Sequence, residues 1–245
     1  MLDYIVLGII QGIFEWIPIS SQGVVALASQ FLIKEVRPLE IALFLHLGTL
    51  FAILIYFKKE WIEVLAFKNK NLLRFLVTST VVSGIIGFIL YKTIQDMAVG
   101  NTLLVLTGFG LLFTAFFNRV KKIWAISPDK LAVIAGILQG LAVIPGLSRS
   151  GATIFGLSLG KLKPGQILKI SYMMSAPAVL GLAGFLFFKN PVLISESWPA
   201  LVFSFLTGLL TLDFLLKAAN KIDFFKFALI FALFCFLGAA LELLF

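Results

Sequence analysis

Residues 18–23 are Pro-Ile-Ser-Ser-Gln-Gly, and they interrupt an otherwise apolar stretch at the start of the chain. Residues 145–151, Pro-Gly-Leu-Ser-Arg-Ser-Gly, interrupt a second apolar stretch, 131–160. Proline removes a backbone donor, and glycine permits tight backbone turns. Irregular backbone at membrane depth is tolerated only where protein or a wet cavity surrounds it. We therefore interpret residues 1–33 and 131–160 as re-entrant helical hairpins, each made of a helix, a break and a second helix.

The rest of the sequence has the composition of a helical membrane protein. Of its 245 residues, 60% are hydrophobic and 13% are charged, whereas a soluble domain carries about 25% charged residues. Apolar blocks of about 20 residues are long enough to cross a bilayer as helices. The sequence therefore predicts an all-α polytopic protein with six full spans, at about 39–57, 72–91, 101–117, 170–188, 199–217 and 226–244.

The loop charges test this topology. If each hairpin returns to the side it entered from, one side of the membrane holds 15 Lys and Arg residues and the other holds four, Lys34, Arg37, Lys92 and Lys189. The positive-inside rule then predicts a multi-pass protein of the cytoplasmic membrane with both termini outside. The net charge of +8 is accordingly assigned to topology and anionic lipid, and no nucleic-acid partner is expected. Four tryptophans, Trp16, Trp61, Trp124 and Trp198, are interpreted as interface anchors.

Each half of the chain has the same predicted layout, one hairpin followed by three spans. An odd number of crossings makes the second half enter from the opposite face, which is an inverted-topology repeat with its site near the midplane. We expect one membrane domain, 1–245, with repeats at about 1–117 and 131–245. The sequence supports the repeat, because Gln11 precedes Gly23 by the interval that separates Gln139 from Gly151.

Arg149 is the most informative polar residue. A guanidinium at bilayer depth costs at least ~2.5–3.5 kcal/mol, so it requires a partner. One interpretation is a structural ion pair with a buried acid. The other is an anion site, in which Ser148, Ser150 and Thr153 supply hydroxyls and Gly146 lets backbone N–H groups converge. A forked cation, hydroxyls and a backbone nest suit phosphate oxygens.

Glu15 is the matching acid, and Gln11 lies four residues before it on the same helical face. Glu15 is either a counter-ion for Arg149 or a functional group, acting as a metal ligand or a general base. Carboxylates suit Mg²⁺ or Ca²⁺, and these ions commonly bridge a protein acid to substrate phosphates. Ser20 and Ser21 follow in the break, where they either break the helix or act on a ligand as donors or nucleophiles.

His46 is the only histidine in the chain and lies near the centre of the span 39–57, between Leu45 and Leu47. Histidine is the side chain that most readily exchanges protons near neutral pH. A lone helical histidine is often a packed polar residue, but its depth in the membrane also makes it a candidate catalytic group.

Two motifs resemble those of the undecaprenyl-pyrophosphate phosphatases, the bacitracin-resistance family. Residues 11–21, Gln-Gly-Ile-Phe-Glu-Trp-Ile-Pro-Ile-Ser-Ser, are similar to its (Glu/Gln)-x-x-x-Glu motif and the following Pro-x-Ser-Ser. Residues 145–153 match its Pro-Gly-x-Ser-Arg-Ser-x-x-Thr motif throughout. The resemblance covers essentially the full length of the chain.

This resemblance implies hydrolysis of a polyprenyl diphosphate to the monophosphate and phosphate. The reaction recycles the lipid carrier for cell-wall synthesis and confers bacitracin resistance. The partners would be the lipid and the membrane, and a homodimer is compatible with the sequence. The resemblance implies that Gln11 and Glu15 serve in metal binding and catalysis, and that Ser21 is a nucleophile or a phosphate ligand. It implies that the diphosphate is bound by Ser148, Arg149, Ser150 and Thr153.

One position departs from the family pattern. The family usually has histidine after the glycine that follows Ser-Ser, and this chain has Val24 there. We consider three explanations: His46 substitutes from the next span, Glu15 and a metal-bound water suffice, or the protein is a weak enzyme or has another role. A transporter or flippase of a phosphorylated lipid or anion, without hydrolysis, is the alternative function.

Overall fold

The computed structural model describes residues 1–16, 21–33, 38–94, 126–144, 147–160, 162, 164–189 and 191–218, together with short pieces within 105–116 and 229–240. These residues form helices and contain no strand, which confirms the predicted all-helical class. The long described helices are α1 (Leu2–Phe14), α2 (Ser21–Leu32), α3 (Pro38–Tyr56), α4 (Lys58–Leu65), α5 (Lys70–Ile94), α7 (Pro128–Leu141), α8 (Arg149–Ser158), α9 (Pro164–Lys189) and α10 (Pro191–Ala218).

Four of the predicted spans coincide with α3, α5, α9 and α10, while 101–117 and 226–244 lie largely outside the described residues. By length and apolar composition, the segments Lys70–Thr93 and Ser197–Phe214 can cross a membrane. A third span is obtained if α3 and α4, which meet at an 82° bend, are taken as one. The predicted spans end at about 57 and resume at about 72, which leaves residues 58–65 in a loop, whereas the structure forms α4 there.

The outward side of α5 carries an apolar stripe at helical spacing. Val77, Val81, Ile85 and Ile89 are each more than half exposed. They lie four residues apart, so they share one face of the helix. An amphipathic helix of a soluble protein turns such a stripe towards its core. Its outward orientation is that of a membrane protein, in which lipid covers the face.

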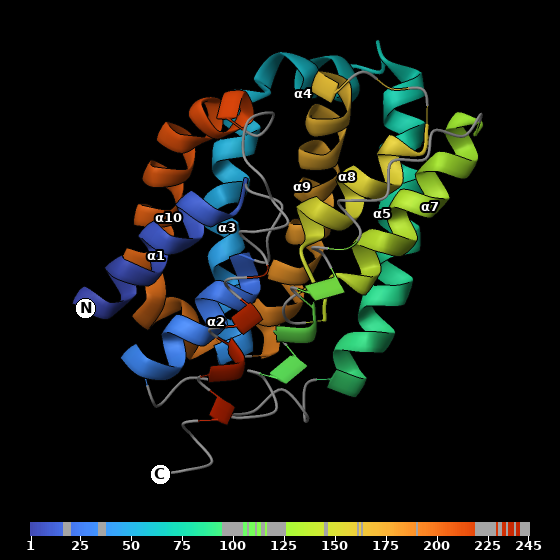
Figure 1. The fold of residues 1–245 in the computed structure, drawn as a ribbon. Coiled ribbons are helices and arrows are strands. Elements are labelled where there is room, and N and C mark those ends of the chain that lie inside the picture. The colour runs from blue at the N-terminus through green and yellow to red at the C-terminus, as the bar shows by residue number, and fades with distance from the viewer. Residues whose placement is uncertain are drawn as a thin grey trace.

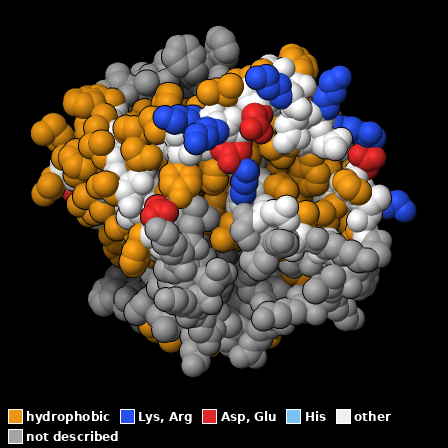
Figure 2. Space-filling model, turned by 90° about the horizontal axis from the view of Figure 1, so that it is seen from above, with side chains coloured by type: hydrophobic (Ala, Val, Ile, Leu, Met, Phe, Trp, Pro, Cys, Tyr) orange, Lys and Arg blue, Asp and Glu red, His pale blue; other side chains and the backbone are white. Residues whose placement is uncertain are grey.

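Charged side chains gather at one end of the molecule (Figure 2), which holds α4 and the starts of α5 and α7 and lies at the top of Figure 1. The exposed charged residues of these described segments are mainly basic: Lys58, Lys59, Glu63, Lys68, Lys70, Arg74, Asp129 and Lys130. The lysines and arginines among them belong to the larger of the two predicted sets of loop charges. The protein therefore has an apolar belt along α5 and a charged boundary at α4.

Each of the two interrupted helix pairs packs its first helix closely on a long helix from the other half of the chain. Figure 1 shows α1 beside α10 and α7 beside α5. A Cβ added to Gly8 would lie 2.3 Å from the Ala200 carbonyl oxygen, and one added to Gly12 would lie 1.9 Å from Thr207 Oγ1. Glycines four residues apart let two helix backbones approach in this way.

The same spacing recurs in α7. A Cβ on Gly136 would lie 2.7 Å from the Ser79 carbonyl oxygen, and one on Gly140 would lie 2.8 Å from Ile86 Cβ. The close approach fixes α1 and α7, and with them the residues at their C-terminal ends. Those ends are where the first and second sequence motifs begin.

Candidate functional site

Glu15 lies at the C-terminal end of α1, and its side chain is 3% exposed. Gln11, one helical turn earlier, donates from Nε2 to Glu15 Oε2 at 2.8 Å. Ser21, the first residue of α2, donates from Oγ to the same carboxylate oxygen at 2.7 Å. The first interrupted helix pair thus directs an amide and a hydroxyl at one buried carboxylate.

Arg149 brings the second helix pair to this carboxylate. It is the first residue of α8, and its Nη2 forms an ion pair with Glu15 Oε1. Its Nη1 donates to the Ser171 carbonyl oxygen in α9 at 3.3 Å. Removing one partner of a buried ion pair leaves an uncompensated charge, which costs about 3–5 kcal/mol. The ion pair with a buried acid, which is one of the two interpretations of Arg149, is present, and Glu15 is that acid.

His46 reaches the same site from α3. Its Nε2 lies 3.3 Å from Glu15 Oε2, and its Nδ1 lies 2.8 Å from the Ala42 carbonyl oxygen. A carbonyl oxygen only accepts, so Nδ1 carries a hydrogen and donates it to Ala42. This fixes the ring orientation and leaves Nε2 facing the Glu15 carboxylate. The residue that one of the three explanations for Val24 invokes therefore lies next to the site acid.

Val24 itself lies elsewhere. Its side chain is buried in a small apolar cluster with Ala232 and Cys235. Ser20 and Gly146, which the sequence analysis assigns to phosphate binding, lie outside the described residues.

The three hydroxyl residues of the second motif organise the start of α8. Ser148 is the N-cap, and its Oγ accepts from the backbone N–H of Gly151 at 2.9 Å. Its Oγ also lies 3.2 Å from Ser150 Oγ. Thr153 Oγ1 bonds the Arg149 carbonyl oxygen at 2.8 Å and lies 2.6 Å from Ser171 Oγ. Arg149 consequently sits at a capped helix N-terminus, where the dipole and backbone N–H groups favour an anion.

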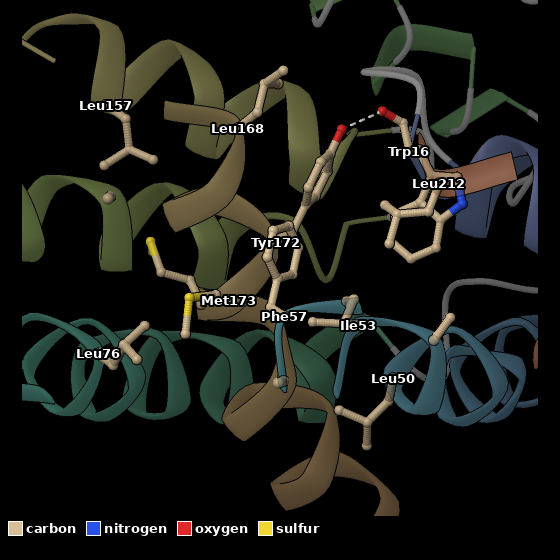
Figure 3. Close-up of a cluster of buried hydrophobic side chains, with 14 of the residues drawn as sticks. Trp16, Leu50, Ile53, Phe57, Leu76, Leu157, Leu168, Tyr172, Met173 and Leu212 are labelled. Carbon is tan, nitrogen blue, oxygen red and sulfur yellow. Dashed lines mark hydrogen bonds between the residues drawn. The ribbon is translucent and has the colours of Figure 1, made fainter. Parts of the chain in front are cut away.

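Trp16 and Tyr172, which Figure 3 shows hydrogen-bonded to each other, hold the backbone next to the site. Neither is among the predicted site residues. Tyr172 donates its hydroxyl hydrogen to the Trp16 carbonyl oxygen at 2.7 Å. The two rings meet edge to face at 5.5 Å. The bond holds the backbone immediately after Glu15 against α9. The signal in the sequence is a pair of polar residues, Ser171 and Tyr172, inside an otherwise apolar predicted span.

The interpretation of Trp16 as an interface anchor is wrong. Its side chain is fully buried, and its Nε1 donates to the Gly208 carbonyl oxygen at 3.0 Å and to Thr211 Oγ1 at 3.2 Å. A buried indole N–H needs a partner, and α10 supplies it inside the protein. Trp198, in contrast, is 57% exposed.

The donor set has the composition of a partial metal site. The described residues contain no group of three or more His, Cys, Asp or Glu side chains placed to hold an ion. Gln11 Oε1 is nevertheless buried without a hydrogen-bond partner among them, next to the Glu15 carboxylate. One carboxylate and a carboxamide oxygen fit an ion such as Mg²⁺, which takes its other ligands from substrate phosphates and water.

A cavity of about 430 Å³ opens beside the ion pair, and His46 and Arg149 line it together with Gln22. Gln22 donates from Nε2 to the Val143 carbonyl oxygen at 3.4 Å. The volume is within the range of ligand pockets, about 300–1,000 Å³. A ligand in this cavity would meet the guanidinium and the imidazole together.

Comparisons with known proteins identify the family of the chain. A sequence profile of the family described as "Bacitracin resistance protein BacA" matches residues 4–240. An undecaprenyl-diphosphatase of Methanococcoides burtonii is 33% identical, over 93% of this chain and 94% of that protein. One from Thermosipho melanesiensis is 36% identical over 87% of this chain and 88% of its own, and one from Methanococcus vannielii is 33% identical over 97% of both. The chain therefore belongs to the bacitracin resistance protein BacA family.

Proposed function

We propose that the protein is an integral membrane phosphatase that hydrolyses undecaprenyl diphosphate to the monophosphate and phosphate, and so recycles the lipid carrier for cell-wall synthesis. The observation that carries the proposal is the hydrogen bond from Ser21 to Glu15, beside Arg149 at a helix N-terminus. A hydroxyl bonded to a base next to a fixed cation is the arrangement of an activated nucleophile in an anion site.

In this proposal, Arg149 and the N-terminus of α8 hold the diphosphate and stabilise the charge that develops on the transferred phosphoryl group. Ser21 Oγ attacks the terminal phosphorus while its proton passes to Glu15, and the bond to the polyprenyl monophosphate breaks. Water then attacks the phosphorus, the bond from Ser21 Oγ to phosphorus breaks, and phosphate leaves with the atoms of the water. Glu15 returns its proton to Ser21 Oγ, so both side chains are restored. If a water attacks directly instead, Glu15 accepts the proton of that water, and Ser21→Ala keeps turnover.

A divalent cation, Mg²⁺ or Ca²⁺, would be held by Gln11 Oε1 and Glu15. When bound, it would neutralise part of the charge of the diphosphate. Ser148, Ser150 and Thr153 keep Arg149 at the start of α8 through the cap and the bonds to its first turn.

We also propose the topology of six spans and two re-entrant hairpins in an inverted repeat, with the termini and the site towards the outer face of the cytoplasmic membrane. The proposal is supported by the matched packing of α1 on α10 and of α7 on α5. In both cases the first helix of a hairpin packs on a long helix from the other half of the chain. Gly8 and Gly12 in α1 have the spacing of Gly136 and Gly140 in α7.

Phosphate release from undecaprenyl or farnesyl diphosphate by the purified protein tests the activity. We expect release with Mg²⁺ or Ca²⁺ and loss of most of it after chelation, because Glu15 already balances the charge of Arg149 and the diphosphate needs a further cation. Phosphate release that is unchanged by chelation would show that the reaction needs no divalent cation. Movement of the lipid between leaflets of a vesicle without phosphate release would support the transporter alternative.

Replacing His46 with alanine should lower kcat by about 10²–10⁴-fold if its Nε2 exchanges a proton with Glu15 during turnover. The measurement is kcat against pH for the wild type and for His46→Ala and His46→Gln. Glutamine keeps a polar side chain but exchanges no proton, so it should not restore the rate. Unchanged turnover in both variants would exclude the substitute-histidine mechanism and leave Glu15 to act without it.

A further inference from the structure

The cavity beside Arg149 extends well beyond the charged groups of the site. It lies among α3, α5, α7 and α9, and along α5 its lining residues run from Thr80 to Tyr91. Eleven residues of helix correspond to about 16 Å. A diphosphate group needs only the part of the cavity next to Arg149 and His46, so the remaining length is available to another part of the ligand.

The wall of this remaining part is mostly carbon. Thr80 Oγ1 donates to the backbone carbonyl four residues earlier at 2.6 Å, and Ser83 and Ser175 donate to the carbonyls three residues earlier at 3.1 and 2.7 Å. Their hydroxyl hydrogens are thereby turned to the backbone of their own helices. Gln139 donates to Ser83 Oγ, and its Oε1, which has no partner among the described residues, is one polar atom in this wall.

The cavity also opens sideways, between α5 and α9. Gly84 and Gly181 both line it, and both are exposed. A Cβ added to either glycine would meet no atom within 4 Å. Phe88 and Leu180 beside them are 48% and 55% exposed, so the opening faces the apolar surroundings of the helices.

We propose that the gap between α5 and α9 at Gly84 and Gly181 is the doorway through which the prenyl chain of the substrate extends from the bilayer to Arg149. The first isoprene units would occupy the carbon-walled part of the cavity, and the rest of the chain would stay in lipid. A cation at one end, a carbon wall along the length and an opening to lipid match a diphosphate on a hydrocarbon chain. The inference rests on the proposed function and adds a determinant of chain recognition to it.

Leucine at either glycine tests the doorway. Gly84→Leu and Gly181→Leu should each raise KM for undecaprenyl diphosphate by about tenfold or more, because the new side chain narrows the opening. Hydrolysis of isopentenyl diphosphate should stay within about twofold of the wild type, since its single isoprene unit fits inside the cavity. The matched control is Gly184→Leu, one turn further along α9. A Cβ at Gly184 also meets no atom within 4 Å, but Gly184 does not line the cavity.

The outcomes are distinct. An unchanged KM for undecaprenyl diphosphate in both doorway variants would overturn the inference, and so would an equal loss for both substrates, which would place the defect at the diphosphate site. An effect of the same size in Gly184→Leu would also overturn it. If the wild type releases no phosphate, the proposed function fails. Equilibrium binding of a fluorescent polyprenyl diphosphate to the same variants then still tests the doorway.

Discussion

Arg149→Ala is expected to lower kcat/KM for undecaprenyl diphosphate by about 10³-fold or more, which is the effect of removing a guanidinium that stabilises a transferred phosphoryl group. The guanidinium lies at the N-terminus of α8 and pairs with Glu15, and in the described part of the chain no other Arg or Lys side chain forms an ion pair with this carboxylate. The measurement is phosphate release at several lipid concentrations. Loss should appear in both kcat and KM, because Arg149 contacts the substrate before and during transfer.

A structural role for Arg149 predicts a different result, and two variants separate the roles. Arg149→Lys keeps the positive charge but loses the forked geometry of the guanidinium. It should therefore fold like the wild type and show little phosphate release. Arg149→Met combined with Glu15→Gln removes both charges and should restore the thermal unfolding midpoint without restoring phosphate release. Arg74→Ala is the matched control, since Arg74 forms an exposed ion pair with Asp129 at the charged end. Full activity in folded Arg149→Ala would refute the proposed anion site.

The sequence predicts this ion pair because several independent features agree on it. Proline and glycine locate the breaks, and the structure ends α1 at Phe14 and α7 at Leu141 as the breaks require. The cost of an isolated guanidinium at bilayer depth demands an acid near Arg149. The two halves of the chain have matching intervals, and these direct Glu15 and Arg149 to one place although 134 residues separate them.

The contact of His46 with Glu15 is beyond what the sequence determines. α3 is apolar on nearly all sides, so its periodicity does not say which face meets α1. The rotation is set by packing, in which Gly48 of α3 approaches the Leu201 carbonyl oxygen and Ser204 of α10. A Cβ on Gly48 would lie 2.6 Å from that oxygen. Only with α3 fixed in this way does the imidazole point at the carboxylate.

Aromatic residues near membrane depth are ambiguous in a similar manner. Trp16 and Trp198 both occur at the edges of apolar stretches, where indoles commonly anchor an interface. Trp16 follows directly after Glu15, and its carbonyl and N–H are bonded to α9 and α10, so it is buried. Composition does not distinguish it from Trp198, because the difference arises from contacts with helices more than 150 residues away.

Glu15→Gln is expected to lower kcat by about 10³-fold or more while the protein remains folded. Glutamine has the same shape and still accepts a hydrogen bond from Ser21, but it does not take the proton that leaves the nucleophile. The substitution also leaves Arg149 without its anion, and a substrate diphosphate can then replace the missing charge. We therefore expect the lipid to bind at least as tightly as it binds to the wild type, while phosphate release is lost.

The combination of the two measurements distinguishes a base from a counter-ion, and a Mg²⁺ titration separates the proposed role as a metal ligand. If Glu15→Gln has lost a metal ligand, the variant should bind the lipid more weakly than the wild type in Mg²⁺ but not after chelation. If Glu15 is the base, kcat falls and the dissociation constant for a fluorescent polyprenyl diphosphate holds or decreases. If Glu15 only neutralises Arg149, Glu15→Gln should keep turnover, because the substrate supplies the counter-charge. Glu60→Gln provides the control, since Glu60 pairs with Lys169 at 2.7 Å, outside the site, and its loss should leave both quantities unchanged. Wild-type turnover in Glu15→Gln would remove Glu15 from catalysis and leave it the structural partner of Arg149.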